Sequence, residues 1–152
     1  MSQRATLHIT IVTAQARVFD GEADAVNVPG GEGRLTILPR HAPLLTTLSL
    51  GELRVRHAGV EEGFFVAGGF LEVNNNVVTI LADDAERASE IDEEHAEAAR
   101  KRAQELLAHP DTSGDLSAIA AAELERAVGR LKVAEIHRNR GGRRRQPTEQ
   151  EL

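Results

Sequence analysis

The chain has 152 residues, which is enough for one ordinary domain or for a domain with a helical extension. Its formal net charge of −6 argues against nucleic acid as the main partner. No apolar run approaches the ~20 residues that a membrane-spanning helix needs, and no secretory signal is visible. Because there is no cysteine, disulfides and thiol chemistry are excluded, and a bacterial type of cytoplasm is the expected compartment.

The first 88 residues have the pattern of short β-strands. Segments such as LHITIV (7–12), GELRVRHAG (51–59) and NVVTILAD (76–83) alternate apolar and polar residues, with Gly, Asn or Pro between the segments. This spacing indicates an antiparallel sandwich or barrel. Residues 74–76, all Asn, are predicted to form a hairpin turn, and Gly68 and Gly69 to mark a tight corner or bulge.

After residue 88 the pattern becomes helical. A first helix is predicted over Ser89–Leu107, because Ser89 and Asp92 are spaced like an N-terminal capping pair. The segment HPDTSGD (109–115) interrupts it, and a second helix is predicted over Leu116–His137. The stripes expected to meet are Ile91, His95, Ala99, Ala103 and Leu106 on the first helix and Leu116, Ala120, Leu124, Ala127, Leu131 and Ala134 on the second.

The predicted fold class is therefore α+β. It consists of an N-terminal antiparallel β-sandwich (1–88), an antiparallel two-helix hairpin (89–138) and a disordered tail (139–152). The arginines of the tail are interpreted as solubilising, with binding to nucleic acid or anionic lipid as the alternative.

The segment GGEGRLTILPRHAPLL (30–45) combines glycines with a histidine between two prolines. It is not a phosphate-binding loop of the P-loop kind, because no lysine follows the glycines and a strand comes next. The six histidines show no paired spacing of the kind that metal sites use. The prolines fix the backbone beside apolar residues, which fits a preformed docking surface or, alternatively, core leucines next to a rigid loop.

Two groups of charged residues invite a chemical interpretation. Asp92 and His95 share one face of the first helix, and Arg126 and Arg130 share one face of the second, so packing could bring all four together or leave them as a solvated salt-bridge edge. An acid–base pair for a small hydrolase would have to come from residues near a strand end. The candidates are Asp83, Asp84 and Glu86, which no nucleophile or metal cluster supports.

Three stretches together resemble the epsilon subunits of bacterial rotary, F-type ATP synthases, over about residues 5–138. They are LHITIVTAQARVFDGEADAVNVPGGEGRLTILPRHAPLLTTLSLGELRVR, FFVAGGFLEVNNNVVTILADDAERASEID and ELERAVGRLKVAEI. The resemblance implies a β-sandwich followed by a helical hairpin in a subunit that is not an enzyme. Such a subunit sits on the central stalk, links gamma to the c-ring, couples proton transport to ATP synthesis and can inhibit ATP hydrolysis.

The resemblance also implies roles for particular residues. Contacts with gamma and the c-ring are expected at Glu32, Arg34, His41, Ala42 and Pro43. Some relatives bind ATP in the folded hairpin, and the matching positions here are Asp92, His95, Arg126 and Arg130. Since His95 replaces an arginine of that motif, weak ATP binding or none is expected, and no other cofactor or metal.

If the hairpin opened, roughly 40 helical residues would reach about 60 Å along gamma. Basic residues could then meet acidic surfaces of the alpha and beta subunits and act as a brake; these are Arg100, Lys101, Arg102, Arg126 and Arg130. The expected location is the cytoplasmic face of the bacterial plasma membrane, with membrane contact only through the complex. The rival interpretation is a stand-alone β-sandwich module that binds a ligand.

Overall fold

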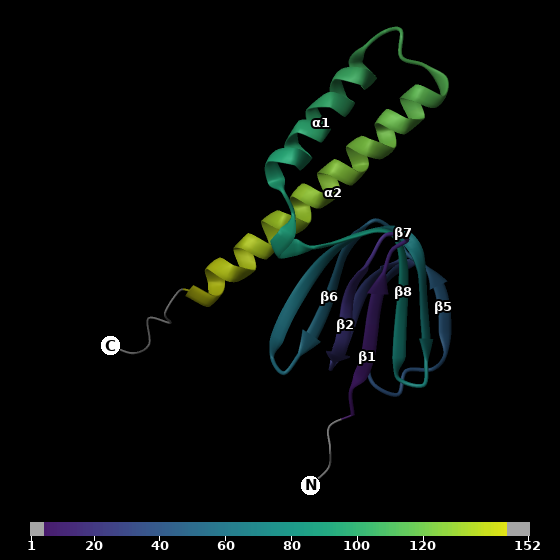
Figure 1. Ribbon diagram of the computed structural model, residues 1–152, viewed down its shortest axis with the longest axis vertical. Coiled ribbons are helices and arrows are strands. Elements are labelled where there is room, and N and C mark those ends of the chain that lie inside the picture. The colour runs from purple at the N-terminus through teal and green to yellow at the C-terminus, as the bar shows by residue number, and fades with distance from the viewer. Residues whose placement is uncertain (1–4, 146–152) are drawn as a thin grey trace. The chain divides into compact units, whose positions relative to one another are not determined.

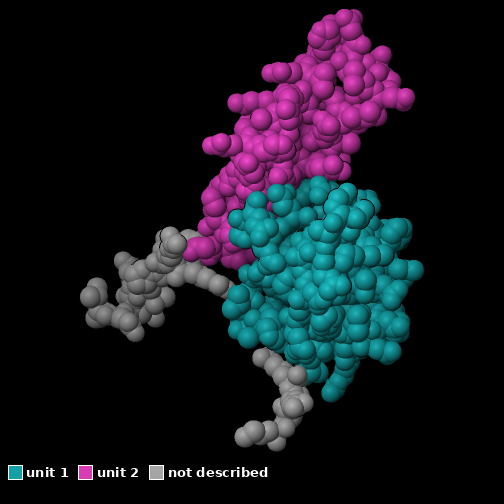
Figure 2. Space-filling view, viewed as in Figure 1, with its two compact units in different colours: residues 1–90 teal, residues 91–152 magenta. Residues whose placement is uncertain are grey.

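The structure, a computed structural model, describes residues 5–145, and describes residues 142–145 by their backbone alone. The chain divides into two compact units, residues 1–90 and residues 91–152, which Figure 2 colours separately. The first unit is built from strands and the second from helices, as Figure 1 shows. The predicted tail at 146–152 lies outside the described residues.

The first unit is a β-sandwich of eight strands, as predicted. The strands are β1 (Leu7–Val12), β2 (Arg17–Ala23), β3 (Ala25–Gly30), β4 (Gly33–Ile37), β5 (Leu44–Thr47), β6 (Gly51–His57), β7 (Val60–Asn74) and β8 (Val77–Arg87). Their order is β2-β1-β8-β7-β6-β3-β4, with β5 beside β7. One pairing departs from the antiparallel prediction, because β1 runs parallel to β8. These strands are far apart in the sequence, so no hairpin turn fixes their direction.

Strand β7 belongs to both layers of the sandwich. Its first half pairs with β6 and its second half pairs with β5, while β8 follows it along both halves. The change of partner occurs at Gly68 and Gly69, whose φ angles are 65° and 111°. The register against β8 does not shift there, so these glycines form a corner without a bulge. A Cβ on Gly69 would lie 2.0 Å from the carbonyl oxygen of Leu81, so only glycine fits.

The core of the sandwich follows from the alternation of its strands. Every second residue of β1 is buried, and β3, β6, β7 and β8 contribute further buried side chains between the layers. The largest buried core side chains are Leu7, Ile9, Ile11, Ile37, Leu53, Phe64, Leu71 and Ile80. The predicted Asn turn is confirmed, since Asn75 and Asn76 have φ angles of 48° and 62°.

The first helix begins later than the sequence predicted. Residues Ala88–Glu90 form a short 3-10 turn, and α1 spans Glu93–Ala108. The N-cap is Asp92, with extended backbone, and its carboxylate accepts a hydrogen bond from the His95 amide at 3.1 Å. Asp92 therefore caps the helix itself, instead of serving as the third helical residue of a box that begins at Ser89.

The second helix, α2, spans Gly114–Arg145 and so continues beyond the predicted end of the hairpin at 138. The prediction of a disordered tail from 139 onward is wrong for residues 139–145, where α2 continues through a glycine pair. Four of these seven residues are arginines, which are good helix formers and offset the helix-weakening effect of the two glycines. The seam between the two antiparallel helices is rich in alanine, as predicted. Its buried alanines are Ala96, Ala103, Ala120, Ala127 and Ala134. The predicted stripe member His95 is exposed instead, and Leu116 lies outside the seam.

Candidate docking surfaces

The turn between β3 and β4 presents Glu32 to solvent. Gly30 pairs with Gly33, which leaves Gly31 and Glu32 as a two-residue turn. Gly33 has a φ of 132°, a conformation that side chains rarely adopt, so the sequence Gly-Glu-Gly builds this tight reversal. Glu32 is exposed and carries its negative charge at the tip of the hairpin, which suits a contact with a partner.

Arg34 lies two residues later, in β4, and braces the outer face of the sheet. Its Nε donates to Asn27 Oδ1 at 2.8 Å, and its Nη2 donates to the Glu52 carbonyl oxygen at 2.7 Å. Burial lowers the pKa of Arg34, the nearby charge of Arg54 lowers it further, and Glu52 raises it. Its guanidinium is therefore committed to β3 and β6, and only part of it remains available to a partner.

The second predicted contact segment, His41–Pro43, forms the loop after β4. The His41 amide donates to the Leu38 carbonyl oxygen at 3.1 Å, and the ring Nδ1–H donates to the Ala42 carbonyl oxygen at 2.7 Å. The Arg40 amide donates to Asn76 Oδ1 at 2.6 Å, which ties this loop to the β7–β8 turn. Ala42 and Pro43 are exposed. The loop is thus a fixed, solvent-facing shape, as the two prolines predict.

The structure does not bring the five predicted contact residues into one cluster. Glu32 and Arg34 lie at the start of β4, whereas His41, Ala42 and Pro43 follow its end. Five residues of strand span about 17 Å, so the two groups lie at opposite ends of β4. The sandwich therefore has two separate candidate contact points instead of a single contiguous site.

Sequence reasoning missed a third surface, an outer apolar patch formed by Leu45, Phe70 and Leu81. Their exposed fractions are 70%, 54% and 54%. Phe70 pairs with Leu81 across β7 and β8, and Leu45 is its diagonal neighbour on β5, because Leu45 lies two residues from Thr47, which pairs with Phe70. Three large apolar side chains that lie next to each other on one sheet face and are exposed form a surface that a partner protein could cover.

The helical unit brings together three of the four residues proposed for nucleotide binding. Asp92 caps α1, and the Nη1 of Arg130 on α2 lies 3.2 Å from the Nδ1 of His95 on α1. Since arginine is always a donor, the His95 Nδ1 accepts and the ring is neutral in this arrangement. Arg126 lies one turn from Arg130 on α2 and is exposed. The carboxylate of Asp92 is occupied as a helix cap.

The proposed brake residues on α1 differ from one another in their surroundings. Arg100 donates from Nε to Glu97 Oε2 at 3.0 Å and from Nη1 to Gln104 at 3.1 Å. This hydrogen bonding holds the pKa of Glu97 below its ordinary value. Lys101 and Arg102 are exposed. Of the three cations, Arg100 is thus already engaged on its own helix.

The three acids proposed for a hydrolase do not share one face of their strand. Strand alternation places Asp83 on one face of β8 and both Asp84 and Glu86 on the other.

Within residues 5–145 no group of three or more histidine, aspartate or glutamate side chains is arranged to hold a metal ion. In the same part of the chain no helix is long and apolar enough to cross a membrane.

Both units match models of known protein domains. Residues 6–88 match the β-sandwich domain of the ATP synthase Delta/Epsilon chain, and residues 89–135 match its long α-helix domain. The ATP synthase epsilon chain of Dehalococcoides mccartyi is 49% identical over 88% of this chain and 96% of its own length. The ATP synthase epsilon chain of Herpetosiphon aurantiacus is 49% identical over 88% and 98%.

A solved structure has the same fold. A chain from the Euglena gracilis mitochondrial ATP synthase, in an assembly of OSCP, F1 and c-ring, superposes with a TM-score of 0.68 at 24% identity. The superposition covers 90% of this chain and 84% of that one.

Proposed function

The chain belongs to the Delta/Epsilon family of ATP synthase subunits, and from this we propose that it is a non-catalytic subunit of the central stalk of an F-type enzyme. In this role it links gamma to the c-ring at the cytoplasmic face of a bacterial plasma membrane and takes part in coupling proton transport to ATP synthesis. The observation that carries the proposal is the family match over both units, from residue 6 to residue 135.

We assign the three surfaces of the sandwich to two partners, gamma and the c-ring. The outer apolar patch of Leu45, Phe70 and Leu81 suits gamma, because an interface that persists through rotation needs a buried apolar centre. Glu32, at the tip of the β3–β4 turn, suits polar loops of the c-ring, and Arg34 braces that turn from behind. The loop His41–Pro43 lies at the other end of β4, where it can extend the gamma contact.

Co-purification with gamma tests this proposal. We expect Phe70→Glu to weaken gamma binding by about 30-fold, because a central apolar contact is commonly worth 2 kcal/mol or more. Val60→Glu is the matched control, since Val60 has the same exposed fraction of 54% and lies at the other end of β7. Failure of the unaltered chain to bind gamma would refute the stalk role. If Phe70→Glu bound gamma as tightly as the unaltered chain, only the proposed position of the gamma interface would be refuted.

For the nucleotide we propose weak binding of ATP or none. His95 occupies the position where the ATP-binding relatives have an arginine. Its neutral ring accepts a hydrogen bond from Arg130, whereas an arginine there would add a second guanidinium group that can bind phosphate. Calorimetry with ATP up to millimolar concentration should give little or no heat for this chain and more for His95→Arg. Strong binding by the unaltered chain would refute this account of His95.

A further inference from the structure

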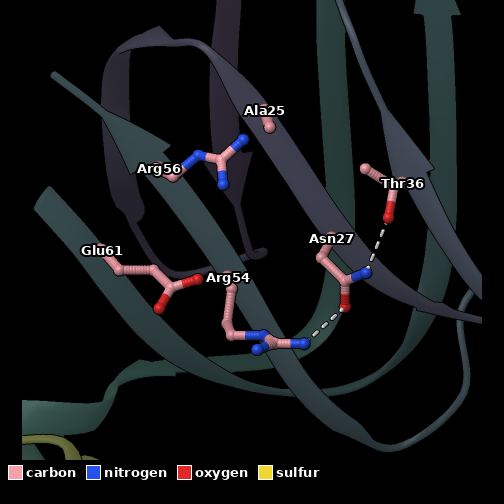
Figure 3. A pocket seen from close by; sticks show the side chains of 6 residues that line it. All are labelled: Ala25, Asn27, Thr36, Arg54, Arg56 and Glu61. Atoms are coloured by element: carbon pink, nitrogen blue, oxygen red, sulfur yellow. Dashed lines mark hydrogen bonds between the residues drawn. The ribbon is translucent and has the colours of Figure 1, made fainter. Parts of the chain in front are cut away.

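A pocket on the outer face of β3, β4 and β6 lies apart from the three surfaces above. It has a volume of about 210 Å³ and is lined by Ala25, Asn27, Thr36, Arg54, Arg56 and Glu61. Figure 3 shows these side chains on one face of neighbouring strands. The register explains their proximity, because Asn27 pairs with Thr36 on one side and with Arg54 on the other, and Arg56 pairs with Glu61.

Two guanidinium groups converge on one neutral oxygen at the edge of this pocket. Arg34 donates to Asn27 Oδ1 through Nε at 2.8 Å and also through Nη2, and Arg54 approaches the same oxygen at 3.3 Å. An amide oxygen has two lone pairs and no formal charge, so it does not neutralise two cations. The arrangement leaves positive potential directed at the space beside Asn27.

The third arginine of this face is without a partner of its own. No hydrogen bond or ion pair of the Arg56 guanidinium occurs within residues 5–145, although Glu61 stands opposite it in the register. Arg54 is held in place by Glu52, whose Oε1 lies 3.2 Å from its Nε. Three arginines against two glutamates leave a surplus of one positive charge around the pocket.

The pocket also offers neutral donors. The Nδ2 of Asn27 donates to Thr36 Oγ1 at 2.9 Å, so the hydroxyl proton of Thr36 remains available to an acceptor. The site thus combines the guanidinium groups of Arg54 and Arg56 on β6 with the hydroxyl of Thr36 on β4. A group with several oxygens in different directions can use all of them, whereas a planar carboxylate can engage only one fork in a bidentate manner.

The size of the pocket limits the ligand. Its 210 Å³ is below the roughly 300–1,000 Å³ of pockets that enclose drug-sized molecules, yet it exceeds the space of a few waters at about 30 Å³ each. We propose that this pocket is a binding site for a small tetrahedral oxyanion of the phosphate type, held by Arg54 and Arg56 with Thr36 as a third donor. A nucleotide is too large to be enclosed there.

The test is an NMR titration of the full chain with inorganic phosphate at constant ionic strength. We expect saturable shifts at the side-chain signals of Asn27, Arg54 and Arg56. Arg56→Gln should weaken the apparent affinity about tenfold, since a hydrogen bond to a charged group contributes roughly 1.5–3 kcal/mol. Arg56 makes no contact that the fold depends on, so this variant should fold normally. Arg17→Gln is the matched control, because it removes a charge from the same unit at an exposed pair with Asp20.

Parallel titrations with acetate and with ATP identify the anion. The proposal expects phosphate to bind more tightly than acetate at this pocket, and ATP to cause smaller shifts there than phosphate. It would be overturned by shifts that rise linearly without saturation, by equal phosphate binding in Arg56→Gln and the unaltered chain, or by acetate binding as well as phosphate. Tighter binding of ATP than of phosphate at these signals would also overturn it. None of these results depends on binding to gamma, so the stalk role is tested separately.

Discussion

At the residue scale, Gly69 shows how one position can decide the shape of the sandwich. Its φ is 111°, and a Cβ added there would lie 2.0 Å from the Leu81 carbonyl oxygen, so there is no room for a side chain. The conformation allows β7 to turn the corner between its two partners, β6 and β5. A side chain there would force either the β7–β8 ladder or the corner to change.

We therefore expect Gly69→Ala to lower the free energy of unfolding of the sandwich by about 3 kcal/mol or more. Gly59→Ala is the control, because Gly59 also has a positive φ, 79°, but no atom lies within 4 Å of the added methyl. That variant should lose only about 1 kcal/mol, the cost of the left-handed backbone. Urea denaturation of both variants measures the difference, and equal losses would contradict the role given to the Leu81 contact.

The cap residue Asp92 makes a smaller and more local contribution. Its carboxylate satisfies the His95 amide, one of the four amides that the start of α1 leaves unpaired. Asp92→Ala should lower the stability of α1 by about 1 kcal/mol, whereas Asp92→Asn should lose much less, since asparagine caps nearly as well. Hydrogen exchange of the first-turn amides of α1 reports the effect. Unchanged exchange in Asp92→Ala would mean that Ser89 caps the helix after all.

At the element scale, the pair of Glu97 and Arg100 gives α1 a measurable dependence on pH. The Arg100 side chain, by hydrogen bonding, holds the pKa of Glu97 below its ordinary value. Because the folded pKa is lowered, the stabilisation is present above the ordinary pKa of glutamate and is lost as the pH falls through the lowered value. Arg100→Gln should raise the pKa of Glu97 toward its ordinary value in an NMR titration, while Arg102→Gln should leave it unchanged. An unmoved pKa in Arg100→Gln would show that this hydrogen bond is not maintained in solution.

The elements also show how far sequence reasoning reaches. Alternation predicts the strands, because one face of each must enter the core. It does not predict the outer apolar patch, since Phe70–Leu71 and Ile80–Leu81 place large apolar residues on both faces and the pattern alone cannot say which one is buried. Large apolar residues at consecutive positions of a strand were the one sign in the sequence that its outer face is also apolar. The start of α1 was misplaced because Ser89 and Asp92 both fit a cap, and only the backbone of the 3-10 turn decides between them.

The candidate site residues were predicted with the same limits. Sequence spacing left open whether Asp92, His95, Arg126 and Arg130 come together, and the structure places the Arg130 guanidinium beside the His95 ring while Asp92 caps the helix. The sequence did not show that Glu32 and His41 lie at opposite ends of β4, because the orientation of that strand relative to the contact surfaces cannot be read from the sequence. The arginine pocket could not be predicted from the sequence either. Its lining residues come from four strands, and the pairing of these strands, not their order in the sequence, brings the residues together.

At the scale of the whole molecule, the alanine seam of the hairpin gives the proposed brake a physical basis. Alanine buries little apolar surface, so closing α1 against α2 is only modestly favourable, and a partner that binds the open helices can shift the equilibrium. The exposed cations Lys101 and Arg102 would then contribute to binding acidic surfaces of the catalytic subunits. The strength of the brake should therefore depend on how stable the closed hairpin is.

Ala103→Leu tests this dependence, because Ala103 is fully buried in the seam and a larger side chain cannot be accommodated there without strain. Overpacking commonly costs about 1–3 kcal/mol, which would favour the open hairpin about five- to more than a hundredfold. In an ATP synthase complex rebuilt with the full chain, this variant should inhibit ATP hydrolysis more strongly than the unaltered chain. Ala121→Leu, at an exposed position of α2, should behave like the unaltered chain. If hydrogen exchange shows that Ala103→Leu opens the hairpin while hydrolysis is unchanged, then opening is not what slows the enzyme, and the helices serve assembly instead.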